Sequence, residues 1–381
     1  MTARWIVLVL YLALMIGIGV YYRRKSASVN DFVLGGRGLG AWFTAFAYGT
    51  SYFSAVIFVG YAGKFGWNYG VASTWVGIGN AVIGSWLAWK VLGRRTRIMS
   101  KHLEAKTMPE YFEKRYNSKP LKIVSALIVF VFLIPYTASV YNGLSRLFEK
   151  GFGIPYKYCI IGMAVFTAVY VIMGGYKATA LNDFIQGIVM LVGIAAVVLA
   201  VLGENGGLGN SLDLLGDIPD ANGDKGTYSS LFGPDPINLA GVVILTSLGT
   251  WGLPQMVQKF YAIKDDKAIK TGTIVSTFFA VVVAGGCYFL GGFGRLFVNS
   301  VDGLPEGETS DPAVRTCYRT CAFGFNVNTF IAGAYIKLHF DYRPYQAYNE
   351  RKNGREKTAY HNANFHCSIS YHLSCACNNH P

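Results

Sequence analysis

Long apolar segments recur along the chain up to about residue 293, and they limit what it can fold into. A helix of about 20 apolar residues crosses a bilayer core, and these segments have that length, with short polar loops between them. Only 14% of the residues are charged, too few for the surface of a soluble domain of this size. We therefore predict an all-α membrane protein with about eight transmembrane helices, at residues 6–22, 41–63, 70–92, 122–142, 156–174, 183–202, 237–262 and 270–293.

The loop charges predict how these helices are oriented. The first segment ends in YYRRKS and lacks a clear cleavage site, so we interpret it as a retained helix, with a signal peptide as the alternative. Basic residues beside a span mark the cytoplasmic side, which places the N-terminus outside. The later loops agree, because loop 93–122 is basic, loop 203–236 is acidic, and the basic residues of the next loop, Lys259, Lys264, Lys267 and Lys270, fall on the cytoplasmic side again.

The distribution of charge and the lack of catalytic residue patterns argue against a nucleic-acid-binding protein and against an enzyme. The formal net charge of +13 is divided among loops rather than gathered on one face, so we expect no nucleic-acid partner. His102 is the only histidine before the C-terminal region, and no paired catalytic constellation is visible. We therefore do not expect an enzyme.

The stretch AYGTSYFSA, residues 47–55, places glycine and hydroxyl side chains in the middle of an apolar segment. Backbone that is not helical survives at mid-membrane only where protein or a water-filled cavity surrounds it. Unwinding frees carbonyl oxygens, and neighbouring hydroxyls can add ligands for a cation such as sodium. The alternative is that these small residues simply let helices pack closely.

The glycine-rich segment NDFVLGGRGLGAW precedes this stretch and raises the possibility of a phosphate-binding loop. It follows no strand, lacks the register of G-x-G-x-x-G and leads into a membrane helix. We therefore do not expect nucleotide binding there.

Several motifs occur in a fixed order along the chain. DFVLGGRGLGAWFTAFAYGTSYFSA is followed by WVGIGNAVIGSWLAWKVLGRRTR, MPEYFEKRYNS, YVIMGGYKATALNDFIQG and GTWGLPQMVQKFYAIKD. Over residues 1 to about 305 the chain resembles the sodium/solute symporter family, which includes bacterial sodium/proline and sodium/sugar cotransporters.

The resemblance implies a fold and a coupling ion. The fold is the leucine-transporter-type inverted repeat with one extra N-terminal helix, in which the first helix of each repeat is broken at the midplane. Carbonyls at positions matching Thr50 and Phe53 would bind the sodium ion, and hydroxyls on a helix of the second repeat would complete its shell. Ser51, Tyr52 and Ser54 would lie along the same substrate or ion path.

Two polar residues of the motif LNDFIQG are further candidates for this path. A carboxylate at the entrance of a span is costly unless it is paired, hydrated or used. Asp183 fits a helix N-cap together with Asn182, and the resemblance implies an acid near the inward path of the ion. The two interpretations are compatible. Gln186, one turn further on, is expected to face the same side.

The segment SLGTWGLPQMVQKF predicts a second local break, because Gly249, Gly252 and Pro254 lie within one apolar run. Trp251 could stack against a solute and Gln255 could hydrogen-bond it, or Trp251 could simply pack inside a kinked helix. Weaker candidates of the same kind are Asn80, Tyr136 and Asn142.

One departure from the family bears on the solute. Where its proline carriers have an aspartate in the broken helix, this chain has Tyr52, which removes a negative charge from the cavity. This departure argues against specificity for proline, and we expect a small organic solute, with a sugar, sialic acid, another amino acid or a small carboxylate as the open alternatives.

The sequence changes character after about Gly307. Five of the seven cysteines and five of the six histidines lie beyond Thr316, and no full-length apolar segment follows. A metal site is one interpretation, although the spacings match no familiar zinc module. Its ligands would be Cys317, Cys321, His366, Cys367, His372, Cys375 and Cys377.

A change of reading frame is the interpretation that we favour. Residues 326–346 can be encoded so that reading one base later gives MSTLSSLVLTSSSTLTIDLI, which resembles the hydroxyl-rich helix of the family. We predict a transmembrane symporter core at 1–307, with an incomplete second repeat, and a disordered or frameshifted tail at 308–381.

The sequence therefore predicts sodium-coupled secondary transport of a small organic solute as the inherited role of a multi-pass cell-membrane protein in the lipid bilayer. Because half of the sodium shell and most of the second repeat would be missing, we expect that the chain alone does not transport. The alternative is a membrane sensor or scaffold without transport.

Overall fold

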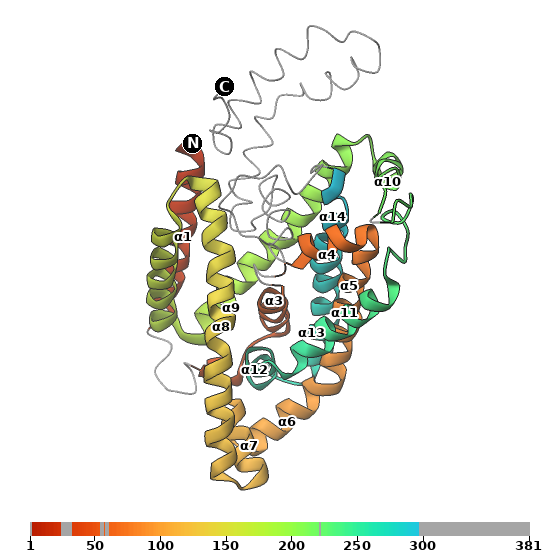
Figure 1. Ribbon diagram of the computed structural model, residues 1–381. Helices are drawn as coiled ribbons and strands as arrows, with labels where there is room; N and C mark the ends of the chain where they lie inside the picture. Colours follow the sequence, from red (N-terminus) through yellow and green to blue (C-terminus); the bar gives the residue numbers. More distant parts are fainter. Residues whose placement is uncertain (1, 24–32, 54–56, 58–60, 221, 297–381) are drawn as a thin grey trace, which may run out of the picture.

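A computed structural model of the protein describes residues 2–23, 33–53, 57, 61–220 and 222–296. Within them the only strand-like pairing is an isolated bridge between Leu39 and Ile263, and the rest is helices and short connections (Figure 1). The elements are α1 (Thr2–Arg23), η1 (Gly35–Arg37), α3 (Ala41–Tyr52), α4 (Ala62–Tyr69), η3 (Gly70–Ser73), α5 (Thr74–Gly79), η4 (Asn80–Leu87), η5 (Trp89–Gly93), α6 (Arg94–His102), α7 (Met108–Tyr116), α8 (Lys119–Phe152), α9 (Tyr156–Glu204), α10 (Leu208–Gly216), α11 (Pro236–Leu248), η6 (Gly249–Gly252), α12 (Pro254–Ala262), α13 (Asp266–Ala280), η7 (Val281–Gly285), α14 (Gly286–Gly292) and η8 (Gly294–Leu296).

The helices form two groups that are joined by α9 (Figure 1). On one side lie α1, α8 and the first part of α9, and on the other lie α4, α5, α11, α13 and α14. The helix α9 bends at Gly175, whose φ of 59° and ψ of −161° suit glycine. Beyond the bend it packs against α3 and α14, where Gly187 approaches Phe46 and Ile194 approaches Gly286.

Among the described residues, four helices are long and apolar enough to cross a membrane, at Ala62–His102, Lys119–Ser145, Val171–Gly203 and Asp266–Leu296. A fifth span results if the bent pair Pro236–Gly252 and Pro254–Ala262 is counted as one. Two shorter apolar helices, Leu8–Arg23 and Tyr156–Val169, correspond to the first and fifth predicted segments. Where the structure describes them, the predicted apolar segments are thus helical, but in this part of the chain fewer than eight have the length of a complete span. Part of the second predicted segment, 41–63, lies outside the described residues.

One of the predicted boundaries is wrong. The expected loop at 175–182 is helical, because α9 runs from Tyr156 to Glu204 and departs from helical geometry only at Gly175. The third segment begins at residue 70 as predicted, because α4 ends at Tyr69 and Gly70 has a φ of 61° and a ψ of −143°, although the long helical span that contains this segment runs from Ala62 to His102. Within that helix, η4 and η5 are π-helical turns, which sequence patterns do not reveal.

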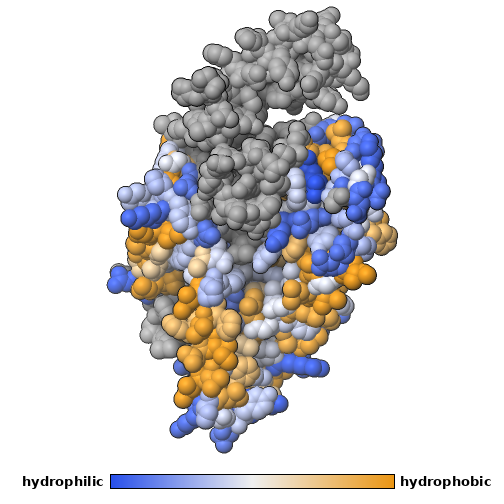
Figure 2. All heavy atoms as spheres, in the orientation of Figure 1, coloured by the Kyte–Doolittle hydropathy of each residue, from blue (hydrophilic) through white to orange (hydrophobic). Residues whose placement is uncertain are grey.

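Exposed apolar side chains cover α8 (Figure 2). They include Ile123, Leu127, Phe130 and Phe132, each more than 60% exposed. None of the residues in the most apolar stretch of this helix is buried. This surface matches the lipid-facing side of a membrane helix.

The core lies around α3, where aromatic rings from four elements meet. Tyr48 of α3 packs against Trp89 and Phe260, with ring centroids 5.5 Å and 5.7 Å apart. Phe46 packs against Phe279 of α13 at 5.3 Å. All five side chains are buried, and they enclose the middle of α3, residues 44–49, in protein.

The glycine-rich turn before α3 has a structural role. Gly35 and Gly36 adopt φ of 60° and 69°, a left-handed geometry that favours glycine. The turn presents Arg37, whose guanidinium donates to the carbonyls of Ser100, Ala105 and Tyr261. Burial of this guanidinium lowers the pKa of Arg37. The turn therefore ties the start of α3 to α6 and to the end of α12.

Gly66 and Gly291 let α4 and α14 approach closely. A Cβ on Gly66 would overlap the backbone of Gly291, whereas Gly241 of α11 has nothing within 4 Å. We predict that Gly66→Ala lowers the free energy of unfolding by roughly 1–3 kcal/mol through overpacking. Thermal unfolding in detergent should show a lower midpoint for Gly66→Ala than for the control Gly241→Ala. Equal midpoints would contradict the close packing of α4 and α14.

Candidate functional site

The helix α3 ends inside the protein, within the stretch AYGTSYFSA. Phe53 has a φ of −93° and a ψ of 61°, and its N–H donates to the Gly49 carbonyl at 2.8 Å. The last carbonyls of a helix have no partner within it. In a continuous helix, the partners of the carbonyls from Thr50 onward would come from residues 54–57, of which the structure describes only residue 57. The break thus begins at Phe53, a few residues later than the centre of the stretch.

The side chains at this helix end differ in their surroundings. Tyr52 and Phe53 are buried, with stacked rings 4.4 Å apart, whereas Thr50 and Ser51 are half-buried. The Thr50 hydroxyl donates to the Phe46 carbonyl at 3.0 Å, within its own helix. Ser54 lies outside the described residues.

A buried polar cluster joins α3, η4 and α11. The Tyr52 hydroxyl lies 3.1 Å from Asn80 Oδ1 and 3.2 Å from the Thr246 carbonyl. Ser247 Oγ donates to the same Asn80 oxygen at 3.1 Å. The sequence predicted Tyr52 and Asn80 as site residues but missed Ser247. The sequence did contain a signal for Ser247, because it is a small polar residue directly before the predicted break.

The second predicted break is confirmed and contacts η4. Pro236–Gly252 and Pro254–Ala262 meet at an angle of 53°, and Leu253 between them is extended. Trp251 Nε1 donates to the Ile83 carbonyl at 3.1 Å, and the Tyr48 hydroxyl donates to the Gly84 carbonyl at 2.8 Å. Trp251 therefore packs the broken helix against η4. This agrees with the alternative in which Trp251 packs inside a kinked helix rather than stacking against a solute.

Several polar atoms near these breaks are buried without a hydrogen bond of standard geometry to any described residue. They are Asn80 Nδ2 and the Tyr288 hydroxyl, which lie close to each other, and both side-chain polar atoms of Gln255. Leaving such a group unpaired costs about 1–3 kcal/mol. Buried polar groups therefore normally have a protein, water or ligand partner. These atoms have hydrogen-bonding capacity to offer to a polar molecule.

Asp183 forms an ion pair with a residue that the sequence analysis had placed among the cytoplasmic loop charges. Lys259 Nζ lies 3.6 Å from Asp183 Oδ2, and the side chains are 8% and 24% exposed. Lys259 also lies 5.2 Å from the centre of the Tyr176 ring. The predicted N-cap role of Asp183 is wrong, because α9 begins at Tyr156 and Asp183 lies well inside it. The pair joins α9 to α12 across the core.

Gln186 does not share the surroundings of Asp183. Its Nε2 donates to the Tyr11 hydroxyl at 2.7 Å and lies 3.9 Å from Met15 Sδ, so it contacts α1. The two residues thus reach different helices, although they are one turn apart.

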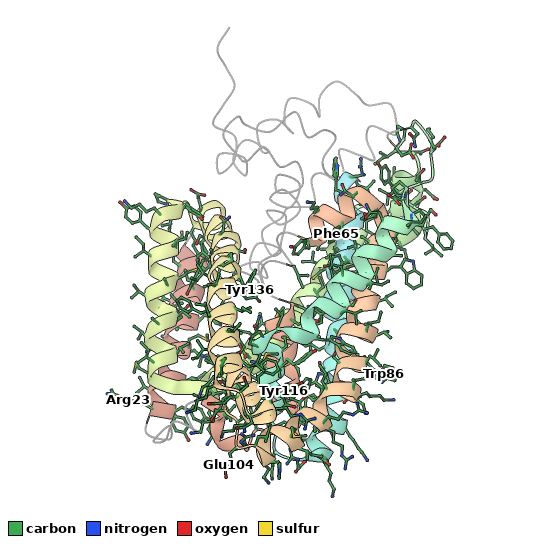
Figure 3. All side chains as sticks on the ribbon, turned by 60° about the horizontal axis from the view of Figure 1, so that its bottom comes forward. Arg23, Phe65, Trp86, Glu104, Tyr116 and Tyr136 are labelled. Carbon is green, nitrogen blue, oxygen red and sulfur yellow. The ribbon has the colours of Figure 1, made fainter. Side chains whose placement is uncertain are left out.

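Tyr136 and Asn142 are also separate from the polar cluster. Both belong to α8, in the group opposite α4 and α5 (Figure 3). Tyr136 is half-buried, and Asn142 is exposed and accepts from the Tyr156 hydroxyl at 2.9 Å. The described residues do not bring these two side chains to the breaks.

Comparison with known proteins decides the family. The model of the sodium:solute symporter family matches residues 32–310. The chain belongs to the sodium:solute symporter family. The predicted resemblance is confirmed, and with its apolar helices this family member is a multi-pass membrane protein.

Its curated relatives include the sodium/proline symporters of Staphylococcus aureus strains JH9 and NCTC 8325 / PS 47. Each is 31% identical over 272 residues, which cover 70% of this chain and 51% of the relative. This symporter-family chain thus spans about half the length of the curated relatives it matches.

A solved structure shares the fold. A Na⁺-coupled sialic acid symporter, described in a substrate-bound outward-open state with a novel Na⁺ site, aligns with a TM-score of 0.67 at 18% identity. The alignment covers 87% of this chain and 68% of the other. The helical arrangement of this chain is therefore similar to the fold of that symporter over the aligned part.

The Asp183–Lys259 pair allows a test of the packing between α9 and α12. Removing one partner of a buried ion pair leaves an uncompensated charge, which costs about 3–5 kcal/mol. We predict that Lys259→Met strongly lowers the unfolding midpoint in detergent, and that the double variant Asp183→Asn/Lys259→Met recovers most of the loss. A double variant as unstable as Lys259→Met would contradict the pairing.

Proposed function

We propose that residues 1–307 of this chain form the sodium-binding and solute-facing part of a sodium-coupled symporter for a small organic solute. The end of α3 at Tyr52 and Phe53 carries the proposal, because it puts helix-terminal carbonyls in the protein interior beside a buried polar cluster. Membership of the sodium:solute symporter family supports the coupling ion. A leucine-transporter-type inverted repeat with one extra N-terminal helix remains our proposal for the complete fold.

We assign the ion to the carbonyls of Thr50 and Phe53. Broken membrane helices bind sodium through unwound carbonyls, and the carbonyls of Thr50 to Phe53 lie at the C-terminal end of α3, where carbonyls have no partner within the helix itself. The Thr50 hydroxyl donates its proton to Phe46, so the backbone oxygen is the principal ligand at this position. The stacked rings of Tyr52 and Phe53 hold this helix end in place.

We assign the solute to the cluster formed by Tyr52, Asn80 and Ser247, with Gln255 and Tyr288 as further donors and acceptors. None of these side chains carries a formal charge at neutral pH, so recognition would depend on hydrogen bonds. Tyr52, in place of the aspartate of the proline carriers, removes a fixed negative charge. This chemistry favours a polar solute such as a sugar, sialic acid, a neutral amino acid or a carboxylate. The Asp183–Lys259 pair would lie on the inward path of the ion.

The ion shell of the described residues is incomplete. Two carbonyls replace only part of the hydration of a sodium ion, and we assign the remaining ligands to hydroxyls of the second repeat, which would lie beyond residue 296. Because we propose that 308–381 is a frameshifted tail, the expectation is that this chain binds sodium weakly and does not transport.

The sodium assignment predicts a cation-specific effect that depends on Phe53. Replacing choline chloride by sodium chloride at equal ionic strength should raise the thermal unfolding midpoint of the purified chain, because an ion that binds only the folded state stabilises it. Phe53→Ala should abolish the difference by loosening the helix end. The matched control Phe43→Ala, at the other end of α3, should retain it. Loss of the sodium effect in both variants would contradict the assigned site.

Transport itself needs a separate measurement. Vesicles containing the full chain would be given an inward sodium or potassium gradient and labelled proline, sialic acid, glucose or a small carboxylate. We expect no sodium-driven uptake of any of the four. Sodium-driven uptake would contradict the expectation that an incomplete sodium shell prevents transport, but it would leave the assigned sodium site in place. The absence of any sodium effect in the unfolding measurement would contradict the sodium site itself.

A further inference from the structure

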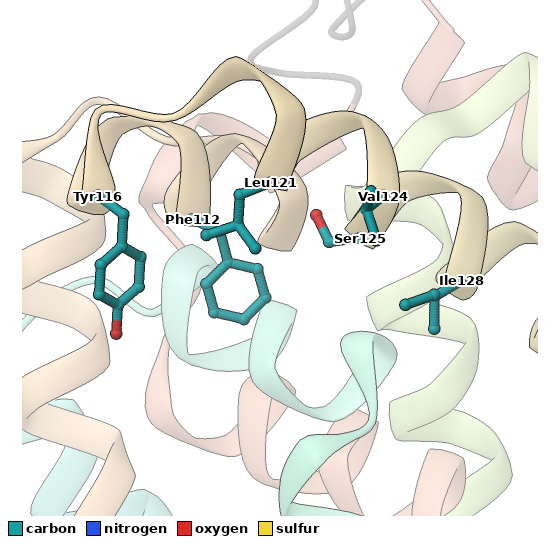
Figure 4. Close-up of a pocket in the computed structure, with 6 residues that line it drawn as sticks. All are labelled: Phe112, Tyr116, Leu121, Val124, Ser125 and Ile128. Carbon is teal, nitrogen blue, oxygen red and sulfur yellow. The ribbon is translucent and has the colours of Figure 1, made fainter.

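A groove lies at the corner where α7 meets α8, away from the candidate site. It has a volume of about 360 Å³ and is lined by Phe112 and Tyr116 of α7 and by four residues of α8 (Figure 4). The α8 residues are Leu121, Val124, Ser125 and Ile128. The only polar side chain of α8 in the groove is Ser125, whose hydroxyl donates to the Lys122 carbonyl at 3.1 Å. The groove is therefore suited to hydrocarbon.

The local fold places this groove at the boundary of a membrane span. Asn117 adopts a left-handed conformation, with φ of 48° and ψ of 44°, and reverses the chain between the two helices. Ser118 caps α8 by accepting from the Leu121 N–H at 3.3 Å. The apolar stretch Lys119–Ser145 begins directly after the cap. The groove thus starts beside a polar turn and continues along the exposed apolar side of α8.

Two cations flank the groove in the sequence. Arg115 precedes Tyr116, and Lys119 precedes Leu121 by two residues; both side chains are exposed. Within the described part of the chain neither forms an ion pair, and the contact of the Arg115 guanidinium is with Met99 Sδ at 3.9 Å. Two neighbouring lysines do form ion pairs with carboxylates. Lys122 pairs with Glu113 at 2.7 Å, and Lys114 pairs with Glu110 at 3.2 Å. Arg115 and Lys119 thus remain available for an anion.

The sign of charge in this region selects the kind of lipid. Loop 93–122 carries nine basic residues against three glutamates, a pattern of the cytoplasmic side. Anionic lipids of the cytoplasmic leaflet attract such segments by about 1 kcal/mol for each basic residue near the surface. A zwitterionic lipid would gain no such attraction.

We propose that the α7–α8 groove is a binding site for an anionic phospholipid. One acyl chain lies against Leu121, Val124 and Ile128, and the phosphate group is held by Arg115 and Lys119. The bound lipid fixes the angle between α7 and the first turns of α8. This site takes no part in the sodium or solute chemistry proposed above.

The test counts lipids that remain bound after purification. The full chain would be extracted from vesicles of equal parts phosphatidylcholine and phosphatidylglycerol, and retained lipids would be measured by mass spectrometry. We expect phosphatidylglycerol to be enriched, and Arg115→Gln/Lys119→Gln to lower its retention at least ~5-fold. The matched control Arg95→Gln/Lys101→Gln removes the same charge on the same side and should leave retention within ~2-fold of the unchanged chain. Equal losses in both variants, or no enrichment, would overturn the site.

A second measurement uses the unchanged chain and does not depend on how the variants fold. Phosphatidylglycerol with a photoreactive acyl chain would be incorporated in vesicles, and the crosslinked peptides mapped. Crosslinks within residues 112–128 that diminish with excess unlabelled phosphatidylglycerol but not with phosphatidylcholine would support the proposal. Equal competition by both lipids, crosslinks confined to other segments, or protection of the groove by a second copy of the chain would each contradict it.

Discussion

The constraint on which the rest of the structure depends is the cost of unpaired backbone in a bilayer. Every interruption of a membrane helix must lie in protein or beside water. The α3 end at Phe53, the π-helical turn η4 and the break at Leu253 are brought together. Side chains bind some of the released carbonyls, as Trp251 binds Ile83 and Tyr48 binds Gly84. This shared interior makes the breaks usable for binding a polar ligand.

Much of the fold could be predicted from the sequence because its signals are local. Apolar length located the helices, and the Gly249, Gly252 and Pro254 pattern located a break that the structure contains. Tyr52 and Asn80 were found because polar side chains are conspicuous in apolar segments. The family followed from several motifs in one order, since a sequence of motifs is far more specific than any single one.

What could not be predicted depends on contacts between distant segments. Lys259 looked like a solvated loop charge, but α12 carries it into the core, where Asp183 of α9 compensates it. The π-helical turns depend on partners from other helices, and the bend of α9 depends on the non-helical conformation of Gly175. Gln186, Tyr136 and Asn142 have suitable chemistry, yet the helix faces that carry them contact other neighbours. Sequence spacing fixes where a side chain lies on its helix but not which helix it meets.

The central claim is that α3 stops at Tyr52 to offer backbone oxygens to a cation within protein. The most direct measurement is a high-resolution cryo-electron microscopy structure of the full chain in a lipid nanodisc at high sodium concentration. The account predicts that the helix ends at Tyr52, with the Thr50 and Phe53 carbonyls directed at a common ion density. A continuous helix through residues 47–57 with its surface against lipid would contradict it.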